Sequence, residues 1–515
     1  MSYCLDDLLK IDLANENIKQ KDRLSMLAQL IDLSADHSHL VGIEKAIETG
    51  KHIESEGVNK NQSAYLYYYL ANAYSHLDRL KHQSSGQLWL WERETFREQI
   101  YYFRKAILHR ANFNDDALIC SAHTNLGNIF SHIGRFIEAD RQWNNALLKK
   151  ADFSMAIASK GKGYHHLSEL LFDPGHKNVY LIKAYHLYKE AIDIGLPKHV
   201  EPIHKKNYRC LREWFLSNTG KEPALSFKSF PLGTTEKEIN YRKWCLKNCL
   251  FLNPLNEIEV ESAFAHDILN LPPMDAKGID FPIYHALFNE LKMEYAYARY
   301  LMFESMEAEN DFANKGLHLI NTLDYPEYGI NVQNMKTCFR LCYSIFDKIA
   351  FFIKEYLQLK TKNELDVSFR KIWYENIKSK KLRPDFIDRA NWALRGLFWL
   401  SKDLYEDNFY NMITEPEAEL IRDIRNHIEH KYLRVLWFVN ENDMGVSENP
   451  QPRLDKAFFN ISREELSRKT LRVLTLAREA ILYLVFAIHI EECNNLKEEN
   501  QEITVEFPLS EYTDF

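Results

Sequence analysis

The sequence contains little glycine and proline, the residues that most often interrupt regular backbone: 17 Gly and 15 Pro among 515 residues. Because strands are bounded by turns that need these residues, their scarcity favours an all-helical chain. It also excludes most glycine-rich phosphate loops, and neither GxGxxG nor GxxxxGKS/T occurs in the chain. Rossmann dinucleotide-binding domains and P-loop nucleotide-binding domains are therefore poor interpretations of this sequence.

An excess of positive charge is also lacking. Lys and Arg together number 65 and Asp and Glu 73, which gives a formal net charge of -8. Proteins that bind nucleic acid through basic tails or histone-like surfaces are strongly basic, so this class is excluded, although a local basic site is not. The hydrophobic fraction of 46% is typical of folded globular proteins, and the length predicts two to four domains.

Paired cysteine motifs and long apolar runs are missing too. The eight cysteines include no CxxC pair, and the closest ones, Cys245/Cys249 and Cys338/Cys342, have the spacing of one helix face. We expect reduced, buried thiols in a cytoplasmic protein. The first residues are acidic and contain no signal-peptide pattern. The longest apolar stretch, 480–490, is too short to span a bilayer and predicts a buried helix and no membrane partner.

A two-helix pattern is present in residues 124–147. It places small residues where two helices would cross and aromatic residues between them: Gly127, Ala139, Ala146, Phe130 and Trp143. These residues and their spacing resemble the tetratricopeptide repeat, a helical hairpin that stacks on its neighbours. A second copy starts 34 residues after Gly127, at Gly161, and carries 11 extra residues between its helices.

Weaker copies lie upstream. One includes Tyr74 and Phe103 with a longer insertion between them, and residues 20–55 suggest a degenerate helical pair that caps the stack. We therefore assign residues 1–200 to tetratricopeptide-like helical repeats, whose insertions would lie on one face and bind a partner. The alternative is a stack of hairpins that only supports another domain.

The rest of the chain divides into three further parts. Residues 201–330 form a helical connecting region, residues 331–493 a compact helical bundle, and residues 494–515 an acidic tail. Apolar residues at helical spacing predict the helices of the bundle, and a Ser-x-x-Glu capping box marks the start of the last one. The expected helices cover residues 332–358, 386–405 and 415–438, and a fourth helix begins at Ser462.

The third expected helix carries an unusual concentration of polar residues. At 100° per residue, one apolar stripe is formed by Ile421, Ile424, Ile428, Tyr432 and Val435. The other side carries charged and polar residues: Arg422, Arg425, Asn426, Glu429 and His430. Arginine binds phosphate oxygens through its forked guanidinium, and histidine transfers protons near neutral pH. The face therefore has the residue types of a phosphate-handling site.

Arg425-Asn426-x3-His430 resembles the Arg-x4-6-His motif of HEPN domains, which are helical bundles found in many prokaryotic toxins and defence proteins. The spacing itself occurs three times in the chain, also at Arg104/His109 and Arg422/His427. The third occurrence stands out because asparagine follows the arginine, the surrounding helix is amphipathic and the predicted bundle has the size of a HEPN domain.

The resemblance implies a metal-independent ribonuclease without a cofactor, which pairs as a homodimer so that two motifs face each other. It implies that His430 is the general acid or base, that Arg425 stabilises charge on the phosphate and that Asn426 orients the site. Arg422, His427 and Glu429 are possible helpers, or alternatively ordinary surface or dimer-contact residues.

Other residues of the predicted bundle are weaker candidates. Ser344 and Asp347 on the first bundle helix could support the site, or could simply belong to a solvated helix face. A basic cluster before the second helix is a candidate for contacts with RNA: Lys378, Lys380, Lys381 and Arg383. His427, Glu429 and His430 could also be considered as metal ligands, but no further Cys or His pair lies nearby in the sequence.

Three functions remain open. The first is an RNA-cleaving toxin or anti-phage effector, in which the repeats sense a protein or another trigger and the HEPN dimer cuts RNA. The second is a non-catalytic scaffold that uses the repeats and a HEPN dimerisation module. A third possibility is a HEPN protein that pairs with a nucleotidyltransferase partner.

Overall fold

The computed structural model describes residues 4–13, 18–59, 62–82, 90–109, 115–275, 281–307, 312–320, 326–361, 367–405, 418–437, 458–499 and 504–505. The described residues form two compact units. Unit 1 contains those of 1–225 and 386–399, and unit 2 contains those of 226–385, 400–405 and 418–505. Within these ranges there are seventeen α-helices and only three two-stranded sheets, so the all-α expectation is confirmed.

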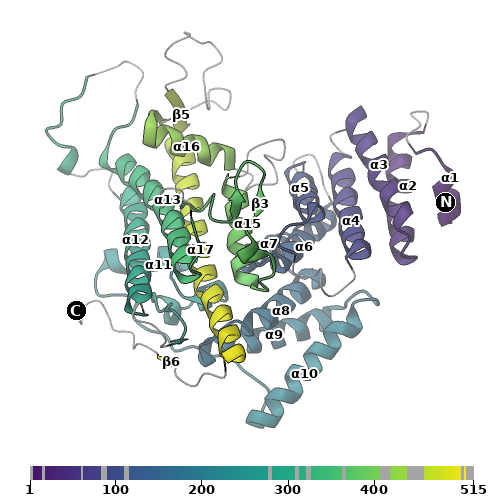
Figure 1. The fold of residues 1–515 in the computed structure, drawn as a ribbon, viewed down its shortest axis with the longest axis horizontal. Helices are drawn as coiled ribbons and strands as arrows, with labels where there is room; N and C mark the ends of the chain where they lie inside the picture. The colour runs from purple at the N-terminus through teal and green to yellow at the C-terminus, as the bar shows by residue number, and fades with distance from the viewer. Residues whose placement is uncertain are drawn as a thin grey trace. The chain divides into compact units, whose positions relative to one another are not determined.

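Unit 1 is built from successive helical hairpins (Figure 1). The hairpins are α2 (Gln20–Asp36) with α3 (Leu40–Glu56), α4 (Ser63–Lys81) with α5 (Glu94–Leu108), α6 (Asp116–His132) with α7 (Phe136–Lys149), and α8 (Ser154–Ser168) with α9 (Pro174–Ile194). α1 (Leu5–Lys10) precedes them and α10 (Glu201–Thr219) follows. Each hairpin packs against the next, which buries one continuous core.

The small residues of the hairpins allow close helix crossings, as the sequence pattern predicts. A Cβ atom added at Gly127 would lie 2.5 Å from Nε1 of Trp143, and Gly163 of the next hairpin lies against the same indole ring. Trp143 also donates its Nε1–H to Oδ1 of Asn128 at 3.2 Å. One tryptophan therefore fills the space between two hairpins, and glycines on both sides leave room for it.

The second copy contains no inserted loop. α9 has 21 residues where α7 has 14, and only residues 169–173 connect it to α8. Pro174 begins the helix, and the Asp173 side chain accepts the His176 N–H at 2.7 Å. The extra residues therefore lengthen the second helix, and the expected loop was wrong because proline and the aspartate cap start that helix early.

The expected bundle helix at residues 386–405 is divided between the two units. α14 (Pro384–Ile387) is followed by α15 (Trp392–Tyr405), whose residues up to Trp399 belong to unit 1. Trp392 donates its Nε1–H to the Ser131 carbonyl at 2.7 Å and stacks on His166 at 4.3 Å between ring centroids. Unit 1 therefore includes a segment that is far from the repeats in the sequence.

The close approach of this segment depends on two glycines. Gly134, which follows α6, has a φ of +93°, a conformation that favours glycine. Its backbone lies directly against Trp392 and Gly396, and a Cβ at either glycine would overlap the backbone of the other segment. A side chain at either position would therefore push residues 386–399 away from the hairpins.

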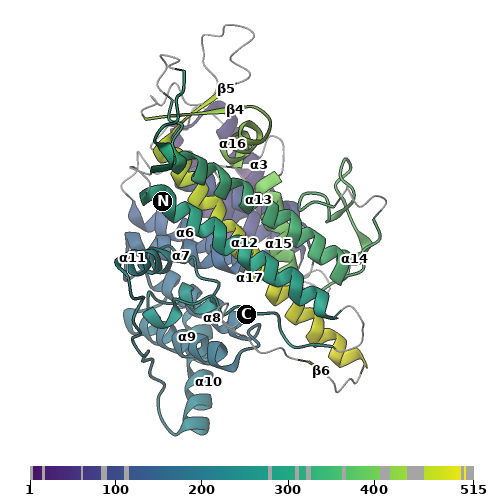
Figure 2. The ribbon, with the colours of Figure 1, turned by 90° about the vertical axis from the view of Figure 1, so that its left-hand side faces the viewer.

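Unit 2 is a helical bundle around α13 (Ile330–Tyr356), which matches the expected helix 332–358. α12 (Phe281–Glu307) and α17 (Arg463–Glu499) lie along it, as Figure 2 shows, and α16 (Ala418–His430) contacts it as well. The unit also includes α11 (Glu236–Lys247) and the short helices η3 (Pro254–Glu257), η4 (Ser262–Phe264) and η6 (Phe312–Asn314). The core side of α13 is fully apolar: Phe339, Cys342, Ile345, Phe346 and Ile349.

The sheets of unit 2 are small. β1 (Met274–Asp275) pairs antiparallel with β6 (Thr504–Val505), and β2 (Tyr374–Asn376) pairs antiparallel with β3 (Lys381–Leu382). β4 (Tyr432–Leu436) and β5 (Phe458–Ser462) pair in parallel, with Tyr432 opposite Phe458. Most of the expected acidic tail lies outside the described residues.

The expected third helix, 415–438, was wrong beyond His430. α16 ends at His430, and residues 432–436 form strand β4, in which Leu433 and Val435 are buried while their neighbours are more exposed. Burial that alternates with a period of two is typical of strands. Over only five residues, the same apolar positions also fit a helical stripe. Pairing with β5, far along the chain, decides between the two structures.

α17 forms much of the core of unit 2. Ser462 accepts the Glu465 N–H at 3.1 Å, so the expected helix start is confirmed. Within the described residues, the stretch Arg463–Asn495 is long and apolar enough to cross a membrane by length and composition, but 83% of its apolar window is buried. Such burial is typical of a core helix, as expected for residues 480–490.

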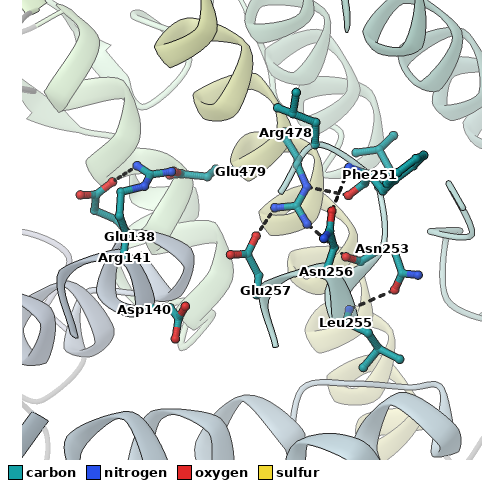
Figure 3. Close-up of polar contacts among 12 residues, drawn as sticks. Glu138, Asp140, Arg141, Phe251, Asn253, Leu255, Asn256, Glu257, Arg478 and Glu479 are labelled. Atoms are coloured by element: carbon teal, nitrogen blue, oxygen red, sulfur yellow. Dashed lines mark hydrogen bonds and ion pairs between the residues drawn. The ribbon is translucent and has the colours of Figure 1, made fainter. Parts of the chain in front are cut away.

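One charged residue of α17 is part of this core. Arg478 is 2% exposed and donates to the Phe251 carbonyl at 2.6 Å and to the Asn253 carbonyl at 3.1 Å. Its guanidinium also forms an ion pair with Glu257, as Figure 3 shows. These bonds hold the segment that follows α11 against the middle of α17.

The eight cysteines form no disulfide with one another, as expected. Four of them are buried: Cys120, Cys245, Cys338 and Cys342. Cys4 and Cys210 are exposed, so the expectation that the thiols are buried applies only to some of them.

Candidate active site

A cavity of about 660 Å³ opens in unit 2 between α12, α13 and α16. The walls come from three helices: Leu287, Glu290 and Leu291 of α12, Arg340, Tyr343, Ser344, Asp347, Lys348 and Phe351 of α13, and Arg425, Glu429 and His430 of α16. Its size is that of a typical small-ligand pocket. Arg425 and His430, the two residues of the motif, therefore line the same cavity.

α13 supplies half of the lining because one of its faces is not apolar. Arg340, Ser344, Asp347 and Phe351 follow one another at intervals of three or four residues, which places them along one side of the helix. The opposite side is buried in the core of unit 2. The pattern of α13 thus both anchors the helix and directs a stripe of three polar residues and Phe351 into the cavity.

The guanidinium of Arg425 is held over an aromatic ring. Its central carbon lies 4.7 Å from the centroid of the Tyr343 ring, and Tyr343 is only 5% exposed. Burial raises the pKa of the Tyr343 phenol, against the opposing effect of the nearby Arg425 and Arg422 charges, so the phenol stays neutral. A cation over a buried ring is stabilised by about 2 kcal/mol where it is desolvated, and Tyr343 therefore fixes the position of Arg425.

Asp347 lies one helical turn after Tyr343 and faces the same cavity. Its Oδ1 accepts the Phe369 N–H at 3.0 Å. Burial raises the pKa of the Asp347 carboxyl, while the Phe369 hydrogen bond and the Arg425 charge oppose this effect. Burial at the site therefore disfavours the charged form of the Asp347 carboxyl.

A second tyrosine, Tyr405, contacts Tyr343. The Tyr405 ring packs edge-on against Tyr343, with 6.2 Å between centroids. Burial, with Tyr343 and Asp347 nearby, raises the pKa of Tyr405 well above its ordinary value. Its hydroxyl is buried and has no hydrogen-bond partner among the described residues. Tyr405 therefore packs against the Tyr343 ring that lies under Arg425.

The raised pKa of Asp347 leads to a pH-dependent prediction. Folding favours the protonated carboxyl, so its contribution to the free energy of unfolding is largest below the unfolded pKa of about 3.9 and falls as pH rises through the folded pKa. Asp347→Asn keeps an acceptor for Phe369 without this charge. We expect the variant to unfold at a higher temperature than wild type at pH 7, with the difference shrinking toward pH 4.

Thermal unfolding of both proteins between pH 4 and pH 8 measures this effect. Asp388→Asn is the matched control, because Asp388 is exposed and should show no such trend. A stability difference between Asp347→Asn and wild type that is constant over this range would contradict the assignment.

Glu429, a predicted helper, is engaged in an ion pair. Nε of Arg340 lies 3.3 Å from its Oε1, and another guanidinium nitrogen of Arg340 donates to the Ile428 carbonyl at 2.6 Å. A cation at the carboxyl end of a helix also interacts favourably with the helix dipole. Arg340 therefore fastens the end of α16, and with it His430, to α13.

The other predicted residues of α16 have different environments. His430 is exposed at the end of the helix and lines the cavity, whereas Asn426 is exposed but lies outside the cavity wall. His427 is buried: its Nδ1–H donates to the Asp423 carbonyl at 2.7 Å and its ring packs against Phe459. Its role in the described residues is to hold α16 against β5.

This arrangement does not suit the alternative of a metal site. The His427 imidazole lies in the core and that of His430 in the cavity wall, so the two rings do not converge. Within the described ranges, no three His, Cys, Asp or Glu side chains come together in a way that could hold a metal ion.

The remaining predicted residues are not part of the cavity wall. Arg422 is nevertheless close enough to Tyr343 for its charge to oppose the rise in the pKa of the phenol. Lys378, Lys380 and Lys381 are exposed in the β2–β3 hairpin, where Lys381 forms a 2.7 Å ion pair with Glu375. Arg383 donates to the Lys360 carbonyl at 3.0 Å. Contacts between this cluster and RNA stay a prediction.

The comparison with known families concerns the part of the chain that holds the cavity. Residues 276–491 match the family model described as LA2681-like HEPN, and this range includes α12, α13 and α16. No curated protein and no solved structure matches the chain. The match covers less than half of the sequence and begins before residue 331, because α12 belongs with the bundle. Residues 276–491 are thus similar to the LA2681-like HEPN family, which supports a HEPN domain in this part of the chain.

Proposed function

We propose that the protein is a metal-independent endoribonuclease and that Arg425 and His430 perform its chemistry. The observation that carries this proposal is that both side chains line one cavity, in the part of the chain that matches a HEPN family. Arg425 is held in place by Tyr343, and Arg340 fastens the helix end that carries His430. Preorganised charge of this kind is what stabilisation of a phosphoryl transition state requires.

The reaction begins with the ribose 2′-hydroxyl. His430 removes its proton, and the 2′-oxygen attacks the adjacent phosphorus while the bond to the 5′-oxygen of the next nucleotide breaks. The leaving 5′-oxygen takes up a proton, so the products are a 2′,3′-cyclic phosphate and a 5′-hydroxyl. Arg425 stabilises the negative charge that accumulates on the phosphoryl oxygens. In a homodimer, a second motif would face the first and supply the acid.

The hairpins of unit 1 provide the regulatory part of the proposal. Their stacked architecture and small-residue crossings support a tetratricopeptide-like region that binds a protein or another trigger. Release of RNA cleavage by such a trigger is the behaviour of a toxin or an anti-phage effector. The net charge of -8 is consistent with weak binding to RNA outside a local site.

Cleavage of total RNA by the full-length protein tests this function. We expect fragments that end in a 2′,3′-cyclic phosphate, and we expect the rate to be unchanged by excess EDTA because His430 and Arg425 need no metal. The ends are identified by their susceptibility to a phosphatase before and after acid opening of the ring. Loss of cleavage in EDTA would contradict the metal-independent mechanism, and the absence of cleavage by the triggered protein would favour the scaffold function.

A further inference from the structure

The two ends of the cavity differ in chemistry. Arg340, Arg425 and His430 belong to one end, because Arg340 bonds the end of α16 and Arg425 lies over Tyr343. Phe351 lies about two turns further along α13 than Tyr343. Arg340 and Phe351 are eleven residues apart on α13, which corresponds to about 16 Å along the helix axis. The cavity thus runs from a cationic end to an apolar end along a single helix.

Phe351 is the exposed aromatic side chain of this wall. It is 42% exposed although it lines the cavity, whereas the Tyr343 ring is buried and already covered by Arg425. The ammonium group of Lys354 lies 5.7 Å from the centroid of the Phe351 ring. The ring is therefore accessible to a flat ligand, and the Lys354 charge beside it is offset by Glu355 at 2.6 Å.

Lys348 lies between the two ends, and two carboxylates offset its charge. Nζ of Lys348 donates to Glu294 at 2.6 Å and also to Glu290. A phosphate is therefore attracted to the end that holds Arg425, and an uncharged, planar group fits the end that holds Phe351. In RNA, the group that is planar, uncharged and close to a phosphate is a nucleobase.

We propose that Phe351 is the stacking platform for an unpaired base next to the phosphate bound at Arg425, so that the site accepts single-stranded RNA. The proposal rests on the function proposed above and specifies its substrate class. In a duplex the bases are stacked inside and paired, so a base reaches such a platform only from a loop, a bulge or an end. Stacking on one aromatic ring tolerates every base, and the platform therefore selects strandedness rather than sequence.

A binding experiment tests the platform without cleavage. The full-length protein is titrated into a 2′-O-methyl oligonucleotide, which lacks the attacking hydroxyl, with 2-aminopurine as a fluorescent base. We expect the fluorescence to be quenched on binding to wild type. Phe351→Ala should remove the quenching and raise Kd about tenfold or more, while Phe351→Tyr should preserve both. Tyr297→Ala is the control, because Tyr297 is exposed on α12 outside the cavity wall.

A second oligonucleotide with an abasic site at the quenched position completes the test. Wild type should bind it as weakly as Phe351→Ala binds the intact strand, and combining the two changes should weaken binding no further. Equal affinity of wild type and Phe351→Ala for the intact strand would overturn the proposal. A change in the molecular mass of Phe351→Ala in solution would also overturn it, since the ring would then be a contact between copies.

Cleavage assays separate this proposal from the proposed function. Stacking-dependent binding without RNA cleavage would leave the platform in place and refute the endoribonuclease. Cleavage of single-stranded and duplex RNA at the same rate, unaffected by Phe351→Ala, would refute the platform and leave the endoribonuclease in place.

Discussion

Replacement of His430 with alanine is expected to lower the rate of RNA cleavage by about 10²–10⁴-fold, the range for loss of a general acid or base. His430 is the imidazole that lines the cavity, at the end of α16, while His427 of the same helix is buried against Phe459. Because His430 is exposed and outside the core, its loss should not destabilise the fold. Initial rates on single-stranded RNA at saturating concentration, with thermal unfolding as a check on folding, measure the effect.

The matched control is His318→Ala. His318 is exposed in unit 2 and lies outside the cavity wall, so its removal should leave cleavage within about twofold of wild type, as is usual for surface substitutions. Cleavage by His430→Ala at the wild-type rate would refute the assignment of His430 as acid or base.

Arg425 can be tested in the same assay with two variants. Arg425→Ala should lose about 10²–10³-fold, the usual loss when a group that stabilises charge in the transition state is removed. Arg425→Lys keeps the charge but not the forked guanidinium that lies over Tyr343, so we expect only partial recovery. Full activity of the lysine variant would show that charge alone is sufficient.

The second large effect concerns stability. Arg478→Ala is expected to lower the free energy of unfolding of unit 2 by about 3–5 kcal/mol, the range for removal of one partner of a buried ion pair. The substitution would leave the Glu257 carboxylate without the Arg478 partner and would remove the donor to the Phe251 and Asn253 carbonyls, the contacts that Figure 3 shows. Urea denaturation followed by circular dichroism measures the loss.

A control on the same helix separates burial from charge. Arg468 pairs with Glu465 at 2.7 Å but is largely exposed, so Arg468→Ala should cost less than about 1 kcal/mol. A double variant, Arg478→Ala with Glu257→Ala, should lose less than the sum of its single variants, because the stranded carboxylate is then absent. Additive losses would mean that the ion pair itself contributes little.

Much of the helical architecture could be predicted because its signals are local. Gly127 and Trp143 lie within one hairpin, and the contact between them is confirmed in the structure. The capping box at Ser462 is likewise formed within a few residues. Helical periodicity already separated Arg425 and His430 from the apolar stripe of α16, and it left His427 off the polar face, in agreement with its burial.

The wall opposite the motif could not be predicted in the same way. Tyr343, Arg340 and Phe351 lie on α13, more than seventy residues before Arg425, and no local pattern distinguishes them from other residues on a helix surface. Ser344 and Asp347 were candidates from helix spacing alone, while the ring under Arg425 depends on how α16 packs across α13. The three-dimensional arrangement of the helices supplies that information.

The amino-acid sequence by itself determined the helices, the hairpin crossings and the pair of catalytic candidates. Each of these depends on side chains within one or two helical turns or one hairpin, where periodicity and residue size act directly. Only the tertiary structure decided that α16 ends in a strand, that residues 386–399 join unit 1 and that Arg425 lies over Tyr343. These features depend on partners far along the chain, and their free energy comes from burial and pairing that no single segment encodes.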